Sequence, residues 1–161
     1  TYDITFDQGK LTLVVNGDKA VIRMPQGSMP LPEAQKKDLR ESMGRDMVFM
    51  WQNLDRYQVQ FLGEKEFAGS EAIELSVTGF GATFHLFLDP ESLLPRGTSF
   101  QSVTAEGPAT VEERVSDYRE VEGVKMPFRT EAFANGKKVS GQAVKTIQFN
   151  TVVGDDLFKI E

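Results

Sequence analysis

The chain has 161 residues, of which 40% are hydrophobic and 26% are charged, as in a globular domain and unlike a disordered or collagen-like chain. Its formal charge of -6 argues against nucleic-acid binding, which depends on Lys and Arg neutralising phosphates. No apolar run approaches the ~18 residues that span a bilayer, and the absence of cysteine excludes disulfides and thiolate chemistry. We predict a single domain over residues 1–161, excised from a longer chain because it starts at Thr1 with no Met and no signal sequence.

The N-terminal segment shows the alternation of apolar and polar side chains that is typical of β-strands. Tyr2, Ile4 and Phe6 alternate with polar residues, and residues 11–15 and 20–24 continue the strand-like pattern. We therefore predict two or three strands of a meander. An irregular loop should follow over residues 25–32, because three prolines there would interrupt regular hydrogen bonding.

Residues 32–54 are the one segment with a convincing helical pattern. Pro32 and Glu33 suit a first helical turn. Apolar side chains then recur every three or four residues on one face: Leu39, Met43, Met47, Met50, Trp51 and Leu54. Gly44 should weaken or kink the helix. Two interpretations of the methionines stay open: they belong to a helix that covers a sheet core, or they border a pocket that adapts to its ligand.

From Tyr57 onward the pattern is again strand-like. Turns are predicted at residues 63–66, 79–81 and 89–92, with alternating runs between them. The run over residues 82–88 carries bulky apolar groups on both faces, with Phe84 and Leu86 on one of them. We expect this strand to lie in the centre of the sheet.

Two consecutive hairpins are predicted between Val111 and Phe149. Glu122-Gly123 and Asn135-Gly136 each join two strand-like runs, and glycine at the second position permits the positive φ that a tight turn requires. In the last run, from Val139 to Asn150, apolar and polar side chains alternate. We expect one long strand there, with one buried and one exposed face.

Residues with catalytic potential are few. His85 is the single histidine and has no nucleophile motif beside it, so a structural role is the favoured interpretation and a hydrolase is the weakest hypothesis. The pair Glu112-Glu113 is expected as solvated charge, and adjacent strand positions face opposite ways. Motifs for zinc, calcium and dinucleotides are missing. The sequence therefore predicts no catalytic residues, no cofactor and no metal site.

Several segments, taken in their order, resemble one known family. They are Pro-Leu-Pro at residues 30–32, FLDPESLLPR at 87–96, DYREVEGVKMPF at 117–128 and DDLF at 155–158. This combination is similar to the outer-membrane lipoprotein carrier (LolA-like) superfamily. It is especially similar to the version appended to insulinase-type zinc peptidases in bacteria.

The resemblance implies an α+β fold, mainly antiparallel β, in which a curved incomplete barrel is covered by a helical segment and encloses an apolar cavity for acyl chains. It also implies a periplasmic or other cell-envelope location in bacteria, with the signal outside the given sequence. The chain departs from the family at its start, where a helix and strands are absent or shortened. It also lacks the zinc motif of the peptidases, so it would be an accessory domain and not the enzyme.

Two functions follow from the resemblance and the residue pattern. In the first, a non-catalytic module binds a lipid or a lipoprotein acyl chain between the sheet and the helix. The lining residues that we expect are Met43, Met47, Met50, Trp51, Phe84 and Leu86. In the second, a structural accessory domain of a secreted peptidase contains no ligand cavity. It docks a partner, such as a zinc peptidase domain of the same chain, through an exposed sheet edge.

Overall fold

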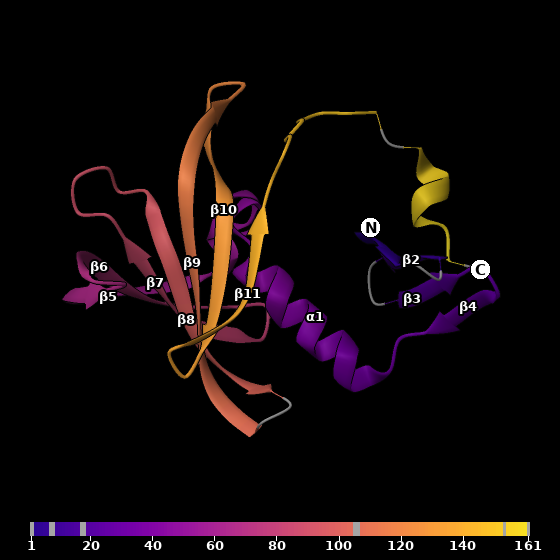
Figure 1. The fold of residues 1–161 in the computed structure, drawn as a ribbon, viewed down its shortest axis with the longest axis horizontal. Helices are drawn as coiled ribbons and strands as arrows, with labels where there is room; N and C mark the ends of the chain where they lie inside the picture. Colours follow the sequence, from indigo (N-terminus) through magenta and orange to yellow (C-terminus); the bar gives the residue numbers. More distant parts are fainter. Residues whose placement is uncertain (1, 7–8, 17–18, 105–106, 153, 161) are drawn as a thin grey trace. The chain divides into compact units, whose positions relative to one another are not determined.

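The computed structural model describes residues 2–6, 9–16, 19–104, 107–152 and 154–160, whose secondary structure is drawn in Figure 1. The chain divides into two compact units, Thr1–Arg40 with Asn150–Glu161 and Glu41–Phe149. Each unit contains its own antiparallel sheet. A compact unit is not by itself a domain, so the single domain over residues 1–161 stays a prediction. None of the helices in the described ranges is long and apolar enough to cross a bilayer.

The smaller unit contains a four-stranded meander. Its strands lie in chain order: β1 (Tyr2–Phe6), β2 (Gly9–Asn16), β3 (Lys19–Met24) and β4 (Gly27–Pro30). The loop predicted over residues 25–32 is wrong in part, because β4 forms within it. Pro25 lies in the turn before β4 and Pro30 ends this edge strand, and proline is tolerated at both kinds of position. The 3-10 turn η2 (Asp155–Phe158) is joined to β2, since the Asn16 side chain donates a hydrogen bond to the Phe158 carbonyl at 3.1 Å.

The predicted helix over residues 32–54 is present but divided. It consists of α1 (Glu33–Arg45), α2 (Met47–Gln52) and the 3-10 turn η1 (Leu54–Arg56). The break lies at Asp46, whose backbone is extended and whose carboxylate accepts a hydrogen bond from the Phe49 N–H at 2.9 Å as the N-cap of α2. Gly44 does not end α1. Instead it allows close packing, because an added Cβ would lie 3.2 Å from the Phe80 Cβ and 3.3 Å from the Gly79 carbonyl oxygen.

The larger unit contains a seven-stranded antiparallel sheet with its strands in chain order. They are β5 (Gln58–Phe67), β6 (Ser70–Gly79), β7 (Ala82–Leu88), β8 (Pro95–Thr104), β9 (Gly107–Val121), β10 (Val124–Ala134) and β11 (Lys137–Ala143). β5 and β11 are its two edges, so the sheet is not closed, and Figure 1 shows its strands curving. The predicted fold class, a mainly antiparallel incomplete barrel with a helical segment, is confirmed.

Both predicted hairpins are confirmed. Glu122-Gly123 joins β9 to β10 and Asn135-Gly136 joins β10 to β11, with positive φ at both turn residues in each case. Two other predictions, about β5 and β11, are wrong. β5 continues through residues 63–66 with a bulge beside Gly63, where a turn was expected. β11 ends at Ala143 and is exposed along its whole length, because it is the outermost strand and no described element of this unit covers it.

The core of the larger unit lies between one face of the sheet and α2. Met50 packs there with side chains of the sheet and of the chain leading into it: Tyr57, Val77, Ala82, Phe84, Leu86 and Phe100. The Tyr57 hydroxyl donates a hydrogen bond to the Gly44 carbonyl at 2.9 Å, and its ring packs on Gly79, where an added Cβ would lie 2.4 Å from a ring carbon. Tyr57 therefore holds the end of α1 against the end of β6.

A second cluster packs on the opposite face of the sheet. The Phe67 and Phe87 rings stack with their centroids 4.1 Å apart, and Ala72 completes the cluster. β7 is consequently buried on both faces, with Phe84 only 1% exposed on one and Phe87 only 3% exposed on the other. The predicted central position of this strand is confirmed.

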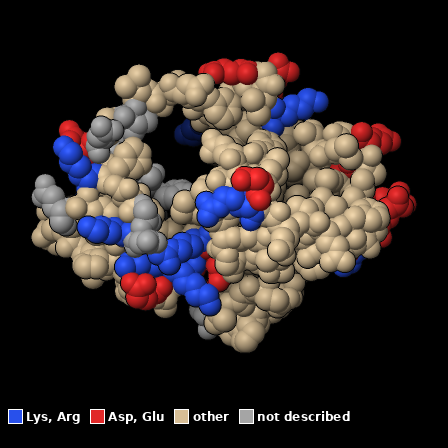
Figure 2. All heavy atoms as spheres, turned by 180° about the vertical axis from the view of Figure 1, so that it is seen from behind, with Lys and Arg blue, Asp and Glu red and all other residues tan. Residues whose placement is uncertain are grey.

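Several charged side chains outside the core are paired along their own strands. Arg114 contacts Glu112 at 2.7 Å, Arg119 contacts Asp117 at 2.6 Å and Arg129 contacts Glu131 at 2.9 Å. Figure 2 shows basic and acidic side chains close together in several places on one face of the molecule. Such exposed pairs contribute little to stability.

Candidate ligand-binding site

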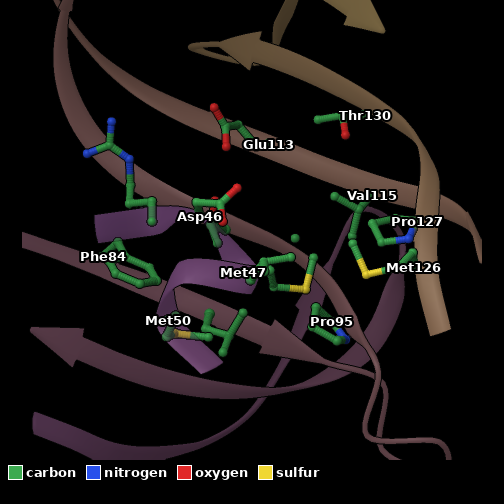
Figure 3. A pocket seen from close by; sticks show the side chains of 15 residues that line it. Asp46, Met47, Met50, Phe84, Pro95, Glu113, Val115, Met126, Pro127 and Thr130 are labelled. Carbon is green, nitrogen blue, oxygen red and sulfur yellow. The ribbon is translucent and has the colours of Figure 1, made fainter. Parts of the chain in front are cut away.

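A pocket of about 190 Å³ lies in the larger unit, between the helical segment and strands β7 to β10. Figure 3 shows it with the side chains that surround it. The helical wall is formed by Arg45, Asp46, Met47, Val48 and Met50. The sheet contributes Phe84, Leu86, Pro95, Gly97, Thr98, Glu113, Val115, Met126, Pro127 and Thr130. Most of these side chains are apolar.

The sheet register explains how distant residues reach one pocket. Leu86 of β7 lies opposite Thr98 of β8, and Thr98 lies opposite Glu113 of β9. Val115, two positions further along β9, lies opposite Thr130 of β10. Since directly opposed residues project from the same face, these side chains all point to the face on which Met50 packs.

The helical wall owes its position to the break at Asp46. The capping hydrogen bond starts α2 there, and the helix then presents Met47 and Met50 to the sheet. Met50 is buried in the core, whereas Met47 is only half-buried. Met126 of β10 also lines the pocket, so flexible thioether side chains border it from the helix and from the sheet (Figure 3).

The structure brings four of the six predicted lining residues into this pocket. These are Met47, Met50, Phe84 and Leu86. Met43 is half-buried and Trp51 is 38% exposed, and neither lines the pocket. The prediction assumed one continuous helix, and the break at Asp46 interrupts its single apolar stripe. Ligand binding by any of the six stays a prediction.

Sequence reasoning missed the part of the lining that comes from β8, β9 and β10. The prediction of solvated charge is wrong for Glu113, whose side chain lies on the opposite face of β9 from that of Glu112. Glu112 pairs with Arg114 at 2.7 Å, whereas Glu113 lines the pocket. The alternation Val111, Glu113, Val115 places this carboxylate within an otherwise apolar face, and that pattern was the available signal.

Two polar groups of the pocket lie side by side. The Thr98 hydroxyl oxygen is buried and has no hydrogen-bond partner in the part of the chain that the structure describes. Burial raises the pKa of the Glu113 carboxyl above its usual value, and the positive charge of Arg45 acts in the opposite direction. The Arg45 guanidinium lies over the Phe100 ring, 3.8 Å from its centroid. The pocket is therefore apolar with one desolvated polar position.

His85 lies on the other face of β7 from Phe84 and Leu86. Its Nδ1 is 2.7 Å from Glu74 Oε1, and Lys65 approaches the same carboxylate at 3.3 Å. These contacts give His85 a carboxylate partner outside the pocket, and its structural role stays a prediction. Within the described ranges, no group of three or more His, Cys, Asp or Glu residues is arranged to hold a metal ion.

Neither a protein-family model nor a curated protein sequence matches the chain. Solved structures do share its fold. An outer membrane lipoprotein-sorting protein domain from Vibrio parahaemolyticus is 14% identical, with a TM-score of 0.56 over 89% of this chain and 65% of that one. A DUF1329 family protein from Desulfovibrio piger is 12% identical, with a TM-score of 0.55 over 93% of this chain and 68% of that one.

A LolA superfamily protein from Nitrosomonas europaea is 14% identical, with a TM-score of 0.53 over 93% of this chain and 70% of that one. The chain spans about two thirds of the length of these proteins. At such low identity the similarity concerns the fold alone. The chain therefore has a LolA-like fold.

Proposed function

We propose that this chain is a non-catalytic carrier module that binds an acyl chain of a lipid or lipoprotein in the pocket between α2 and the sheet. The observation that carries the proposal is the pocket's lining. Met47 and Met50 supply apolar contacts from the helix, and Leu86, Val115 and Met126 supply them from three strands. An apolar pocket with a few polar groups is the usual form of a small-molecule site.

The size of the pocket limits how much ligand it holds in this conformation. Its volume of about 190 Å³ is below the roughly 300–1,000 Å³ of typical ligand pockets. Part of an acyl chain would be buried there, and about four buried methylenes at roughly 0.8 kcal/mol each would contribute on the order of 3 kcal/mol. Met47 and Met126 could rearrange to admit more of the chain. Modest affinity suits a carrier, which must release what it binds.

The proposed location is the bacterial periplasm or another part of the cell envelope. The structural neighbour from Vibrio parahaemolyticus is an outer membrane lipoprotein-sorting protein domain, and a similar role for this chain would place it in that compartment. The proposed partner is then the acyl chain of a lipid or lipoprotein.

A neutral fluorophore tests the proposal directly. We expect delipidated protein to bind N-phenyl-1-naphthylamine saturably, and a long-chain lipid to displace it. Met47→Trp should weaken binding at least about tenfold by filling the pocket from the helix, and Met126→Trp should do the same from the sheet. Met29→Trp is the matched control, because Met29 is an exposed residue of β4 in the smaller unit.

Circular dichroism would confirm that each variant is folded. Saturable binding with the same affinity in both pocket variants would place the fluorophore elsewhere and refute the proposal. Absence of any saturable binding to the wild-type protein would refute it as well.

A second candidate function rests on β11. All seven residues of this edge strand are exposed, and an open edge can accept a further strand from a partner. The partner in this hypothesis is a zinc peptidase domain. Gly141→Pro, in the middle of β11, should abolish association with such a domain in sedimentation experiments while leaving fluorophore binding unchanged. Association that survives this substitution would rule out docking through β11.

A further inference from the structure

One position in the pocket differs chemically from the rest of its lining. Thr98 of β8 and Glu113 of β9 lie directly opposite each other, and Leu86 of β7 lies on the other side of Thr98. In the neighbouring row, Phe100 lies opposite Val111, so that row is apolar. The polar pair therefore occupies a defined place within an apolar face.

The protein itself leaves the hydroxyl of this pair unsatisfied. The Thr98 hydroxyl oxygen is buried and has no hydrogen-bond partner among the described residues. The neighbouring Glu113 carboxyl is partly buried, which raises its pKa, and the charge of Arg45 acts in the opposite direction. Buried polar groups in folded proteins almost always have a partner, so the unpartnered Thr98 hydroxyl in a pocket indicates a partner supplied by the ligand.

The other charged groups that line the pocket are already engaged. Asp46 accepts the capping hydrogen bond from the Phe49 N–H, and the Arg45 guanidinium lies on the Phe100 ring. Thr98 and Glu113 are therefore available to a ligand that reaches this part of the pocket, and Thr130, opposite Val115 in the next row, is the further uncharged polar residue of the lining.

Charge and hydrogen-bonding capacity narrow the choice of ligand. The charged side chains that line the pocket are Arg45, Asp46 and Glu113, one cation and two carboxylates. A ligand carboxylate would be repelled by the ionised Glu113, whose acidic oxygens accept hydrogen bonds and donate none. A ligand hydroxyl can donate to Glu113 and accept from the Thr98 hydroxyl, so it satisfies both groups.

We propose that the pocket selects acyl compounds whose head carries an uncharged hydroxyl or amide N–H group, such as a monoacylglycerol, over free fatty acids. The head group donates to Glu113 and accepts from Thr98, while the chain lies along Met47, Leu86 and Met126. This inference rests on the proposed function, because it requires the acyl chain to enter this pocket.

Two ligands of equal chain length test the selection. Displacement of N-phenyl-1-naphthylamine by 1-monolauroylglycerol and by laurate, at pH 8 and below their micelle concentrations, gives both affinities. We expect the wild-type protein to bind monolauroylglycerol about tenfold more tightly than laurate. The neutral head group hydrogen-bonds to Glu113, whereas the laurate carboxylate is repelled by it.

Substitutions of Thr98 and of Glu113 should each reduce this preference, the first by weakening binding of the neutral ligand and the second by strengthening binding of laurate. Thr98→Val removes the hydroxyl at nearly constant volume and should weaken monolauroylglycerol binding about fivefold, the effect of one hydrogen bond, with little change for laurate. Glu113→Gln removes the repulsive charge and should tighten laurate binding, so that the preference falls. Ser99→Ala is the matched control, because Ser99 is the next residue of β8 and faces the other side of the sheet.

The outcomes separate this inference from the proposed function. Equal binding of both ligands by the wild-type protein, or a preference that persists in Thr98→Val and Glu113→Gln, overturns the inference and leaves acyl binding in place. Failure of the fluorophore and both ligands to bind the wild-type protein overturns the two proposals together. If Thr98→Val does not fold, as judged by circular dichroism, Thr98→Ala removes the same hydroxyl.

Discussion

The two faces of the seven-stranded sheet differ in how their polar side chains are paired. On the outer face of β9, Glu112 is paired with Arg114, and the Arg114 guanidinium also lies 4.0 Å from the centroid of the Phe133 ring. On the pocket face, Glu113 is desolvated and Thr98 lacks a hydrogen-bond partner among the described residues. Glu112 is therefore satisfied within the protein, whereas the Thr98 hydroxyl on the pocket face is not, and we propose that a ligand supplies its partner.

Removing one large ring from each face should give the largest contrast. Phe84 is 1% exposed in the core of the pocket face, so Phe84→Ala should lower the free energy of unfolding by about 3–5 kcal/mol. Phe133 is only half-buried beneath Arg114, so Phe133→Ala should cost less than about 2 kcal/mol. Urea denaturation measures both. Equal losses would show that the two faces contribute equally to the core.

A methyl group added at Gly97 should clash with the backbone of β9 and with the Phe67 ring of the second cluster. An added Cβ there would lie 2.1 Å from the Glu113 carbonyl oxygen and 2.9 Å from the Phe67 ring. Gly97→Ala should therefore destabilise the protein by roughly 1–3 kcal/mol, the usual cost of overpacking. At Gly141 of the exposed β11, the closest atom to an added Cβ is 3.5 Å away, so Gly141→Ala should not destabilise. Similar thermal unfolding of the two variants would contradict this reading of Gly97.

Replacing the unpaired hydroxyl of the pocket should stabilise the protein. Thr98→Val removes a buried group without a partner, and we expect a gain of about 1 kcal/mol in the free energy of unfolding. Thr83 is the control, since its hydroxyl lies 3.1 Å from that of Thr78, and Thr83→Val should give no gain. A stability loss in Thr98→Val would mean that its hydroxyl already has a partner. If Thr98→Val is more stable but binds monolauroylglycerol less well, the hydroxyl serves ligand binding at the expense of stability.

The two adjacent glutamates of β9 should differ in how their effect depends on pH. Burial raises the pKa of Glu113 above 4.5 in the folded protein, so the folded state binds more protons than the unfolded state between pH 4.5 and that raised value. Stability is therefore lost as pH rises through this window. Glu113→Gln should gain stability over the wild type at pH 7 and show no gain at pH 4. Glu112→Gln should change stability by less than about 0.5 kcal/mol at both pH values, because its ion pair is partly exposed.

Chemical denaturation at pH 4 and pH 7 measures these differences. A pH-independent effect at Glu113 would show that its carboxyl is solvated, as the sequence interpretation of the Glu112-Glu113 pair had it.

Much of the fold could be predicted from the sequence because its signals are local. The Asn135-Gly136 turn depends on the conformations of two residues, and the helical pattern over residues 32–54 depends on spacing along one segment. The central position of β7 followed from apolar groups on both of its faces. By contrast, exposure of β11 depends on what covers the edge of the sheet, and its own alternation carries no information about that.

The lining of the pocket likewise depends partly on local sequence and partly on tertiary structure. Four of the predicted lining residues were found because they lie in two strongly apolar segments, the helix and β7. Which residues meet them was decided by the tertiary structure alone. The break at Asp46 sets the position of α2, and the register of β8 and β9 places Thr98 beside Glu113 although they lie 15 positions apart in the chain. Strand register depends on contacts between distant segments, so no local pattern of either strand encodes the polar position at the centre of the proposed site.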